Sequence, residues 1–83
     1  MEYNVRLTRA ADKEMLRLEK DVRIRIADAI DELSSDPLLA SIKLKTPFPG
    51  YRLRVGDYRI LFTVEKRDVT IYSIAHRKDV YRQ

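Results

Sequence analysis

The stretch Tyr51-Arg52-Leu53-Arg54-Val55-Gly56-Asp57-Tyr58-Arg59-Ile60-Leu61-Phe62 decides how this chain folds. Apolar and cationic residues alternate along it and are interrupted at Gly56-Asp57. Alternation with period two predicts a strand whose two faces differ chemically. Two such runs with a Gly-Asp break between them predict a β-hairpin that turns at this dipeptide.

The predicted hairpin collects its cations on one face. Val55 would lie opposite Tyr58, and Arg54 opposite Arg59, so that Arg52 joins these two arginines. Like charges directly opposed on a sheet destabilise it. Either the side chains splay into water, at a cost of roughly a few tenths of a kcal/mol, or the face binds phosphate, for which the guanidinium fork is suited. The hairpin alone leaves both interpretations open.

Length and composition predict one small globular domain that spans residues 1–83, with 45% apolar and 36% charged residues. The absence of cysteine excludes disulfides, zinc–thiolate sites and a thiol nucleophile. The N-terminus lacks a signal-peptide pattern and no apolar run reaches membrane-spanning length, so we expect a cytoplasmic protein without a membrane partner. A net charge of +4 favours an acidic partner, such as nucleic acid.

The rest of the chain supplies two helices and three further extended segments. Residues 2–7 alternate like a strand, and Thr8 can cap a helix that runs to about Leu18. A second helix follows Asp21 as N-cap and ends before Pro37. The later segments are a short extended piece at 42–45, a polar four-residue turn at 65–68 and a last strand over 69–75. The predicted fold class is α+β with the order β-α-α-β-β-β, a helical hairpin packed on one face of a small antiparallel sheet.

The register of the last hairpin decides which residues of the last strand lie on the same face as the arginines. With Val64 opposite Val69, Phe62 would face Ile71 and Ile60 would face Ser73. Alternation then places four residues of the last strand on the arginine side: Thr70, Tyr72, Ile74 and His76. One residue of slip would invert this assignment.

A cluster of arginines with the single histidine and a terminal tyrosine suits RNA cleavage. Attack by the neighbouring 2′-hydroxyl needs a base, an acid and cations for the charge on the phosphorane. One histidine and scattered carboxylates form no metal-ligand set, so we expect neither metal nor other cofactor. Tyr81 could stack on a base. A lone histidine at a strand end is, however, more often structural, and a basic tail is more often solvated or bound to a partner.

The chain resembles the RelE/ParE superfamily of toxins from toxin–antitoxin systems. The resemblance covers nearly the whole chain and rests on the element order and three motifs: Lys43-Leu44-Lys45, Tyr51-Arg52-Leu53-Arg54-Val55-Gly56-Asp57-Tyr58-Arg59 and His76-Arg77-Lys78-Asp79-Val80-Tyr81. It implies a ribosome-dependent mRNA endonuclease that cuts in the A site and leaves a 2′,3′-cyclic phosphate and a 5′-hydroxyl.

The resemblance also implies roles for particular residues. Arg52 and Arg54 match two basic positions of the family's second strand, and Arg59 matches its phosphate-binding arginine. Arg77 matches the arginine that acts as acid or transition-state clamp, and Tyr81 the tyrosine that stacks on the message. We expect the remaining cations of these segments to bind RNA: Lys43, Lys45, Lys78 and Arg82.

One departure from the family concerns the general base. The founding type has lysines where this chain has Arg52 and Arg54, and an arginine practically never gives up its proton. Since only a histidine has an unperturbed pKa near 7, we hypothesise that His76 acts as base or acid. The tail is also shorter between Arg77 and Tyr81 than in the founding type.

Two other functions compete with cleavage. ParE-type proteins share the fold, inhibit DNA gyrase and lack the nuclease residues; an inactive RNA-binding module is the third possibility. In every toxin interpretation, the resemblance implies a cognate RelB-like antitoxin that lays an acidic or amphipathic segment along the basic surface or against the helices. The nuclease interpretation adds mRNA on the ribosome and rRNA as partners.

Overall fold

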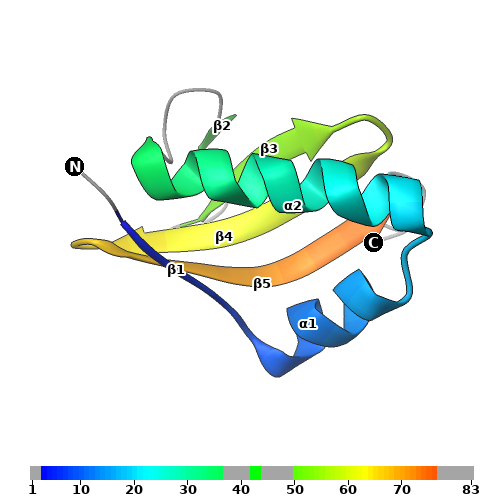
Figure 1. Cartoon of the computed structure of the whole chain (residues 1–83). Coiled ribbons are helices and arrows are strands. Elements are labelled where there is room, and N and C mark those ends of the chain that lie inside the picture. The colour runs from blue at the N-terminus through cyan, green and yellow to red at the C-terminus, as the bar shows by residue number, and fades with distance from the viewer. Residues whose placement is uncertain (1–2, 37–41, 44–49, 77–83) are drawn as a thin grey trace.

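The structure is a computed structural model that describes residues 3–36, 42–43 and 50–76. Two helices pack on one face of a five-stranded sheet with the order β1-β5-β4-β3-β2 (Figure 1). In chain order the elements are β1 (Asn4–Leu7), α1 (Arg9–Leu16), α2 (Lys20–Ser35), β2 (Ile42–Lys43), β3 (Tyr51–Val55), β4 (Tyr58–Glu65) and β5 (Asp68–His76). The predicted α+β class and the order β-α-α-β-β-β are confirmed, and the two-residue β2 is a further short strand within the extended piece predicted at 42–45.

The sheet is mixed, whereas the sequence predicted an antiparallel one. β1 pairs with β5 in the parallel sense, with Val5 beside Val69 and Leu7 beside Ile71. The connection through both helices carries the chain from β1 to β2 at the opposite edge of the sheet. The antiparallel run from β2 to β5 then crosses the sheet and brings β5 beside β1 in the parallel sense. The other three pairings are antiparallel.

The core lies between the sheet and the helices. Its fully buried side chains come from both helices and from β4 and β5: Ala11, Ile26, Leu33, Ile60, Phe62, Val69, Ile71 and Ile74. Burying one large aliphatic or aromatic side chain contributes about 1.5–3 kcal/mol. Tyr51 stacks on Phe62 with ring centroids 5.8 Å apart, which extends the core onto β3.

Local hydrogen bonds define both ends of α1. The hydroxyl of Thr8 accepts a hydrogen bond from the Ala11 N–H at 3.2 Å, as an N-cap should. α1 ends at Leu16, earlier than predicted, because the N–H of Arg17 donates to the Glu14 carbonyl and tightens the last turn. The N-cap of α2 is Glu19 and not the predicted Asp21. Among the described residues, no helix is long and apolar enough to cross a membrane.

Two tight turns join β3 to β4 and β4 to β5. Gly56 has φ +59° and is the first turn residue of the predicted hairpin, in which Val55 pairs with Tyr58 and Arg54 with Arg59, as expected. The second turn is shorter than the four residues predicted, because Glu65 already pairs with Asp68. Its first residue, Lys66, has φ 56°.

A β-bulge interrupts the pairing of β4 with β5. Phe62 pairs with Ile71 as predicted, but Leu61 pairs with Ser73 and Ile60 with Ile74. Tyr72 is therefore the extra residue, and the predicted pairing of Ile60 with Ser73 is wrong. The bulge allows Ile71 and Ile74, three residues apart, to be buried on the same face, at 0% and 3% exposure.

α1 completes the edge of β5 beyond the bulge. β1 covers this edge only as far as Ile71, whose carbonyl accepts from the Thr8 N–H at 2.9 Å. Further along, the Ile74 N–H donates to the Glu14 carboxylate at 3.3 Å. A carboxylate from a helix thus takes the place of a neighbouring strand.

Replacing Gly56 by alanine is expected to destabilise the fold by about 1–2 kcal/mol, because an L-residue is strained at this positive φ. The added Cβ would also lie 3.2 Å from Nη2 of Arg25. Gly56→Asn should cost less, since asparagine tolerates this conformation better. Urea unfolding with an unchanged m-value measures both losses, and equal losses for alanine and asparagine would contradict the strain argument.

Replacing Glu14 by alanine is expected to cost about 1–3 kcal/mol, because the Ile74 N–H loses its acceptor. Glu14→Gln retains a carbonyl oxygen and should lose less. Hydrogen exchange at the Ile74 amide provides the local measurement, with faster exchange in the alanine variant. An unchanged exchange rate would show that another group satisfies this N–H.

Candidate nucleic-acid interface

Three arginines share the face of the sheet opposite to the helices. Arg54 pairs with Arg59 across the β3–β4 hairpin, and Arg52 pairs with Leu61 one step further along. Directly paired residues project to the same face, and their neighbours Leu53 and Ile60 pack into the core. We call this face the arginine face and define it by Arg52, Arg54, Arg59 and the residues in register with them.

The three arginines differ in their surroundings. Arg52 and Arg59 are half-buried, whereas Arg54 is exposed. The Arg54 Nε donates to the Gly56 carbonyl at 3.4 Å, which holds this side chain toward the hairpin turn. Half-burial restricts the rotamers of Arg52 and Arg59 before any ligand binds, so that less entropy is lost on binding.

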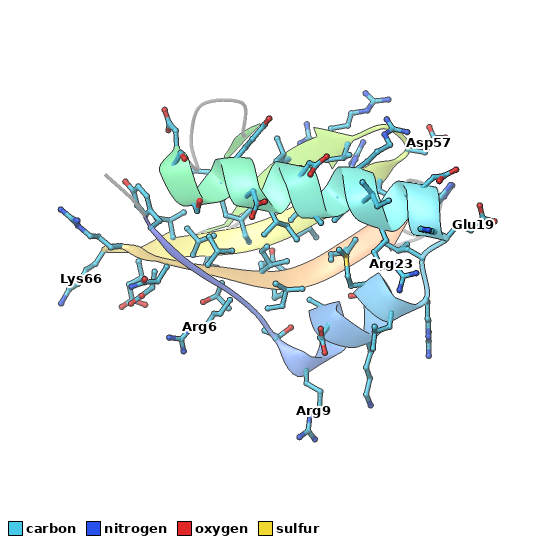
Figure 2. All side chains as sticks on the ribbon, in the orientation of Figure 1. Arg6, Arg9, Glu19, Arg23, Asp57 and Lys66 are labelled. Carbon is cyan, nitrogen blue, oxygen red and sulfur yellow. The ribbon has the colours of Figure 1, made fainter. Side chains whose placement is uncertain are left out.

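Arg25 of α2 adds a cation at the hairpin turn that sequence reasoning missed. Its guanidinium nitrogens lie 3.2 and 3.6 Å from the position that a Cβ on Gly56 would occupy. In Figure 2 the label of Asp57 shows where this turn lies, at the end of the β3–β4 hairpin. The helical periodicity of residues 20–35 places Arg25 between apolar positions and gives no signal that it reaches the turn.

The bulge moves His76 to the other face of the sheet. Beyond it, Ser73 and Ala75 are in register with Leu61 and Arg59, and therefore lie on the arginine face. His76 pairs with Tyr58 on the helix face, with its ring edge-on to that of Tyr58 at a centroid distance of 5.1 Å. The predicted placement of Ile74 and His76 among the arginines is wrong, because one extra residue inverts all later positions. Thr70 and Tyr72 keep their predicted face, since they precede the inversion.

Arg6 is a further cation of the arginine face that sequence reasoning did not include. It is exposed, and it is in register with Thr70, which pairs with Thr63. Figure 2 shows its side chain extending from β1 away from α2. The alternation of Tyr3, Val5 and Leu7 already placed Arg6 opposite to the core, but only the parallel pairing of β1 with β5 assigns it to this sheet face.

Several predicted site residues lie outside the described part of the chain. Arg77 follows directly after the last residue of β5, and the others in this group are Lys45, Lys78, Tyr81 and Arg82. Of the predicted pair Lys43 and Lys45, the structure describes the backbone of Lys43, which pairs with Tyr51. Within residues 3–36, 42–43 and 50–76, no three His, Asp or Glu side chains gather as a metal site.

Comparison with protein families assigns the chain to a class. Residues 5–81 match the family described as ParE toxin of type II toxin–antitoxin system, parDE. Among curated protein sequences, none matches significantly. The chain therefore belongs to the ParE toxin family, within the RelE/ParE superfamily, and the resemblance inferred from its motifs is confirmed.

Solved structures of toxins from this superfamily share the fold of this chain. The toxin–antitoxin complex RelBE2 of Mycobacterium tuberculosis matches with a TM-score of 0.86 and 25% identity, over 93% of this chain and 100% of that one. The archaeal RelE–RelB complex of Pyrococcus horikoshii matches with a TM-score of 0.81 and 27% identity, over 93% and 97%. A mutant of the Escherichia coli toxin RelE in the free state shares the fold, with a TM-score of 0.81 and 23% identity over 99% and 93%. The chain is thus a type II toxin of RelE-like fold.

The contact of His76 with Tyr58 predicts a structural role for the histidine. Aromatic pairs of this geometry contribute about 0.5–1.5 kcal/mol beyond their burial, so His76→Ala should lower the free energy of unfolding by about 1 kcal/mol. His76→Phe keeps an aromatic ring and should retain most of the stability. Chemical denaturation of both variants measures the difference, and an alanine variant as stable as the wild type would contradict the packing role.

Proposed function

We propose that this toxin is an endoribonuclease of the RelE type that cleaves mRNA in the ribosomal A site. The observation that supports the proposal is the convergence of Arg52, Arg54 and Arg59 on one face of the sheet. An opposed arginine pair costs stability in the free protein, and an RNA phosphate would offset that cost. Two guanidinium groups side by side therefore suit a bound polyanion.

The proposed reaction is transfer within the RNA backbone. The 2′-oxygen attacks the adjacent phosphorus, and the bond from phosphorus to the 5′-oxygen breaks. In this scheme solvent water accepts the 2′-hydroxyl proton, and water also supplies the proton that the departing 5′-oxygen takes up. The products are a 2′,3′-cyclic phosphate and a 5′-hydroxyl. No metal ion takes part in this proposed scheme, because guanidinium groups carry the charge stabilisation.

The arginines have distinct proposed roles in this scheme. Arg59 is half-buried and binds the scissile phosphate with its planar fork. Arg52 and Arg54 stabilise the additional charge of the phosphorane, a contribution that is often the largest in such reactions. Of the two roles that the resemblance implies for Arg77, we propose the clamp at the leaving oxygen, because an arginine practically never gives up its proton. Tyr81 stacks on a base of the message.

The position of His76 argues against the proton-transfer role hypothesised for it. Its ring packs against Tyr58 on the helix face, on the opposite side from Arg52, Arg54 and Arg59. A general base must come within about 3 Å of the proton that it removes. We therefore propose that charge stabilisation by arginine, and not His76, accounts for most of the rate.

The partners follow from the proposed activity. The similar structures from Mycobacterium tuberculosis and Pyrococcus horikoshii are complexes with antitoxins, and we propose a RelB-like antitoxin with an acidic or amphipathic segment for this chain. Ribosomal RNA and mRNA are the proposed targets of Lys43, Lys45, Lys78 and Arg82. Action on translating ribosomes would place the protein in the cytoplasm.

Inhibition of DNA gyrase is the second candidate function. The matching family is described by its ParE toxin, and gyrase inhibition would need no nuclease residues. A supercoiling assay with the purified toxin tests this candidate directly.

Toe-printing of a translated message is the decisive experiment for the nuclease proposal. Wild-type protein, purified free of antitoxin, should cut inside the A-site codon. Arg59→Gln and Arg54→Gln should each slow cleavage about 10²-fold, because each removes a donor that stabilises the transition state. Arg77→Ala should also abolish the cuts.

Two matched controls sharpen this experiment. Arg9→Gln removes the same charge from an exposed position on α1 and should cleave like the wild type. His76→Phe should also retain cleavage, since it keeps the ring contact and removes the titratable group. No cuts from folded wild-type protein would reject the nuclease proposal, and a folded but inactive His76→Phe variant would return His76 to the mechanism.

A further inference from the structure

A tyrosine, Tyr72, lies on the arginine face at the bulge in β5. Ile71 and Ile74 are both buried, so the two residues between them, Tyr72 and Ser73, lie on the opposite side of the strand. Ser73 is in register with Leu61, which places Tyr72 beside this half-buried leucine. Tyr72 is itself half-buried. A half-buried ring has little freedom to lose when a flat ligand covers it.

Cations lie diagonally on both sides of Tyr72. Arg54 and Arg59 are level with Ala75, on β3 and β4. Arg6 is level with Thr70, on β1 at the far edge. Neighbouring strands are about 4.8 Å apart, so Arg6 lies one strand beyond Tyr72 and Arg59 one strand before it. A chain of phosphates that passes over the tyrosine would meet a guanidinium at either end.

A pair of acidic residues restricts the path that an RNA strand can take along the sheet. Glu65 and Asp68 are exposed and paired with each other, one step past Thr63 and Thr70. Alternation places them on the side of the arginine face. Lys66 and Arg67 in the same turn balance the charge of the two carboxylates. The carboxylates are, however, the groups on the side of the arginine face, and they disfavour a phosphate path straight along β4 and β5 relative to the exit toward Arg6.

We infer that the arginine face binds single-stranded RNA beyond the scissile phosphate, with one base stacked on Tyr72 and one phosphate held by Arg6. This inference rests on the proposed function and extends it to a longer substrate. Aromatic side chains between cations on a sheet are a general solution for single-stranded RNA, because every base has a face that can stack. Such contacts give affinity with little sequence preference.

The chain contains no tryptophan, and this allows a direct test. Tyr72→Trp introduces a single indole whose emission reports stacking. The probe is a nine-nucleotide RNA with 2′-O-methyl groups throughout, which cannot be cleaved through its 2′-oxygens. The emission should fall in a saturable manner as the RNA is added. Ile24→Trp places the indole on α2, where the side chain is 51% exposed, and its emission should stay constant.

Affinity measurements separate stacking from packing. Tyr72→Leu retains apolar bulk without an aromatic ring and should weaken binding about tenfold by fluorescence anisotropy of labelled RNA. Tyr72→Phe retains the ring and should bind like the wild type. For the nine-nucleotide RNA, Arg6→Gln should lower the slope of log affinity against log salt concentration by about 0.7. For a trinucleotide, the same substitution should leave both the affinity and this slope unchanged.

The outcomes distinguish this inference from the proposed function. RNA binding could depend on Arg59 while the emission of the Tyr72→Trp variant stays constant and Tyr72→Leu binds with full affinity. This result would reject the stacking site and leave the proposed function standing. Absence of RNA binding by the wild type, together with no cleavage, would reject both proposals. Quenching by an acidic peptide but not by RNA would assign the face to a protein partner and also overturn the inference.

Discussion

Burial of Ile71 and Ile74 against the helices fixes how β4 and β5 pair. A regular strand would turn these residues to opposite faces, because side chains alternate and the two are three positions apart. The bulge at Tyr72 resolves this conflict, and the Glu14 carboxylate supports the altered strand by accepting from the Ile74 N–H. The rest of the architecture depends on this adjustment, since it decides which face each later residue occupies.

The bulge also decides which functional side chains lie on each face of the sheet. Tyr72 and Ser73 join the arginines, whereas His76 is turned to the helix side and packs on Tyr58. One extra residue thus puts Ser73 and Ala75 beside the arginines in place of Ile74 and His76, whereas Tyr72 keeps its face. The proposed chemistry changes accordingly, from proton transfer by histidine toward charge stabilisation and stacking. Interfaces of this kind bind by electrostatics and π-contacts, which tolerate many sequences.

The arrangement of charges suits a ligand that crosses the sheet diagonally. The Arg54–Arg59 pair carries a repulsive cost in the free protein, and the opposed Glu65 and Asp68 carry another. The Arg54–Arg59 pair lies beside the β3–β4 turn and the Glu65–Asp68 pair beside the β4–β5 turn, so the two pairs stand at opposite ends of β4. Polar arrangements that cost stability are more frequent at functional sites than elsewhere.

The sequence by itself determined the elements, the β3–β4 hairpin and the family. Period-two alternation around Gly56 fixed which residues of this hairpin face the core, because the turn leaves only one register. The motifs in residues 43–81 identified the toxin family that the comparison of residues 5–81 confirms. Local patterns were sufficient here because each of these features depends on neighbours in the chain.

Only the tertiary structure decided the parallel partner of β1, the bulge and the faces of Arg6 and His76. The alternation of Val69 and Ile71 breaks at the polar Ser73, and Ile74 follows one position late, but this break alone does not identify Tyr72 as the extra residue. Its position follows from packing, since Ile74 joins the buried core on the helix side only when the register shifts. Contacts between residues far apart in the chain thus assign the faces, and the faces decide which side chains can meet one ligand.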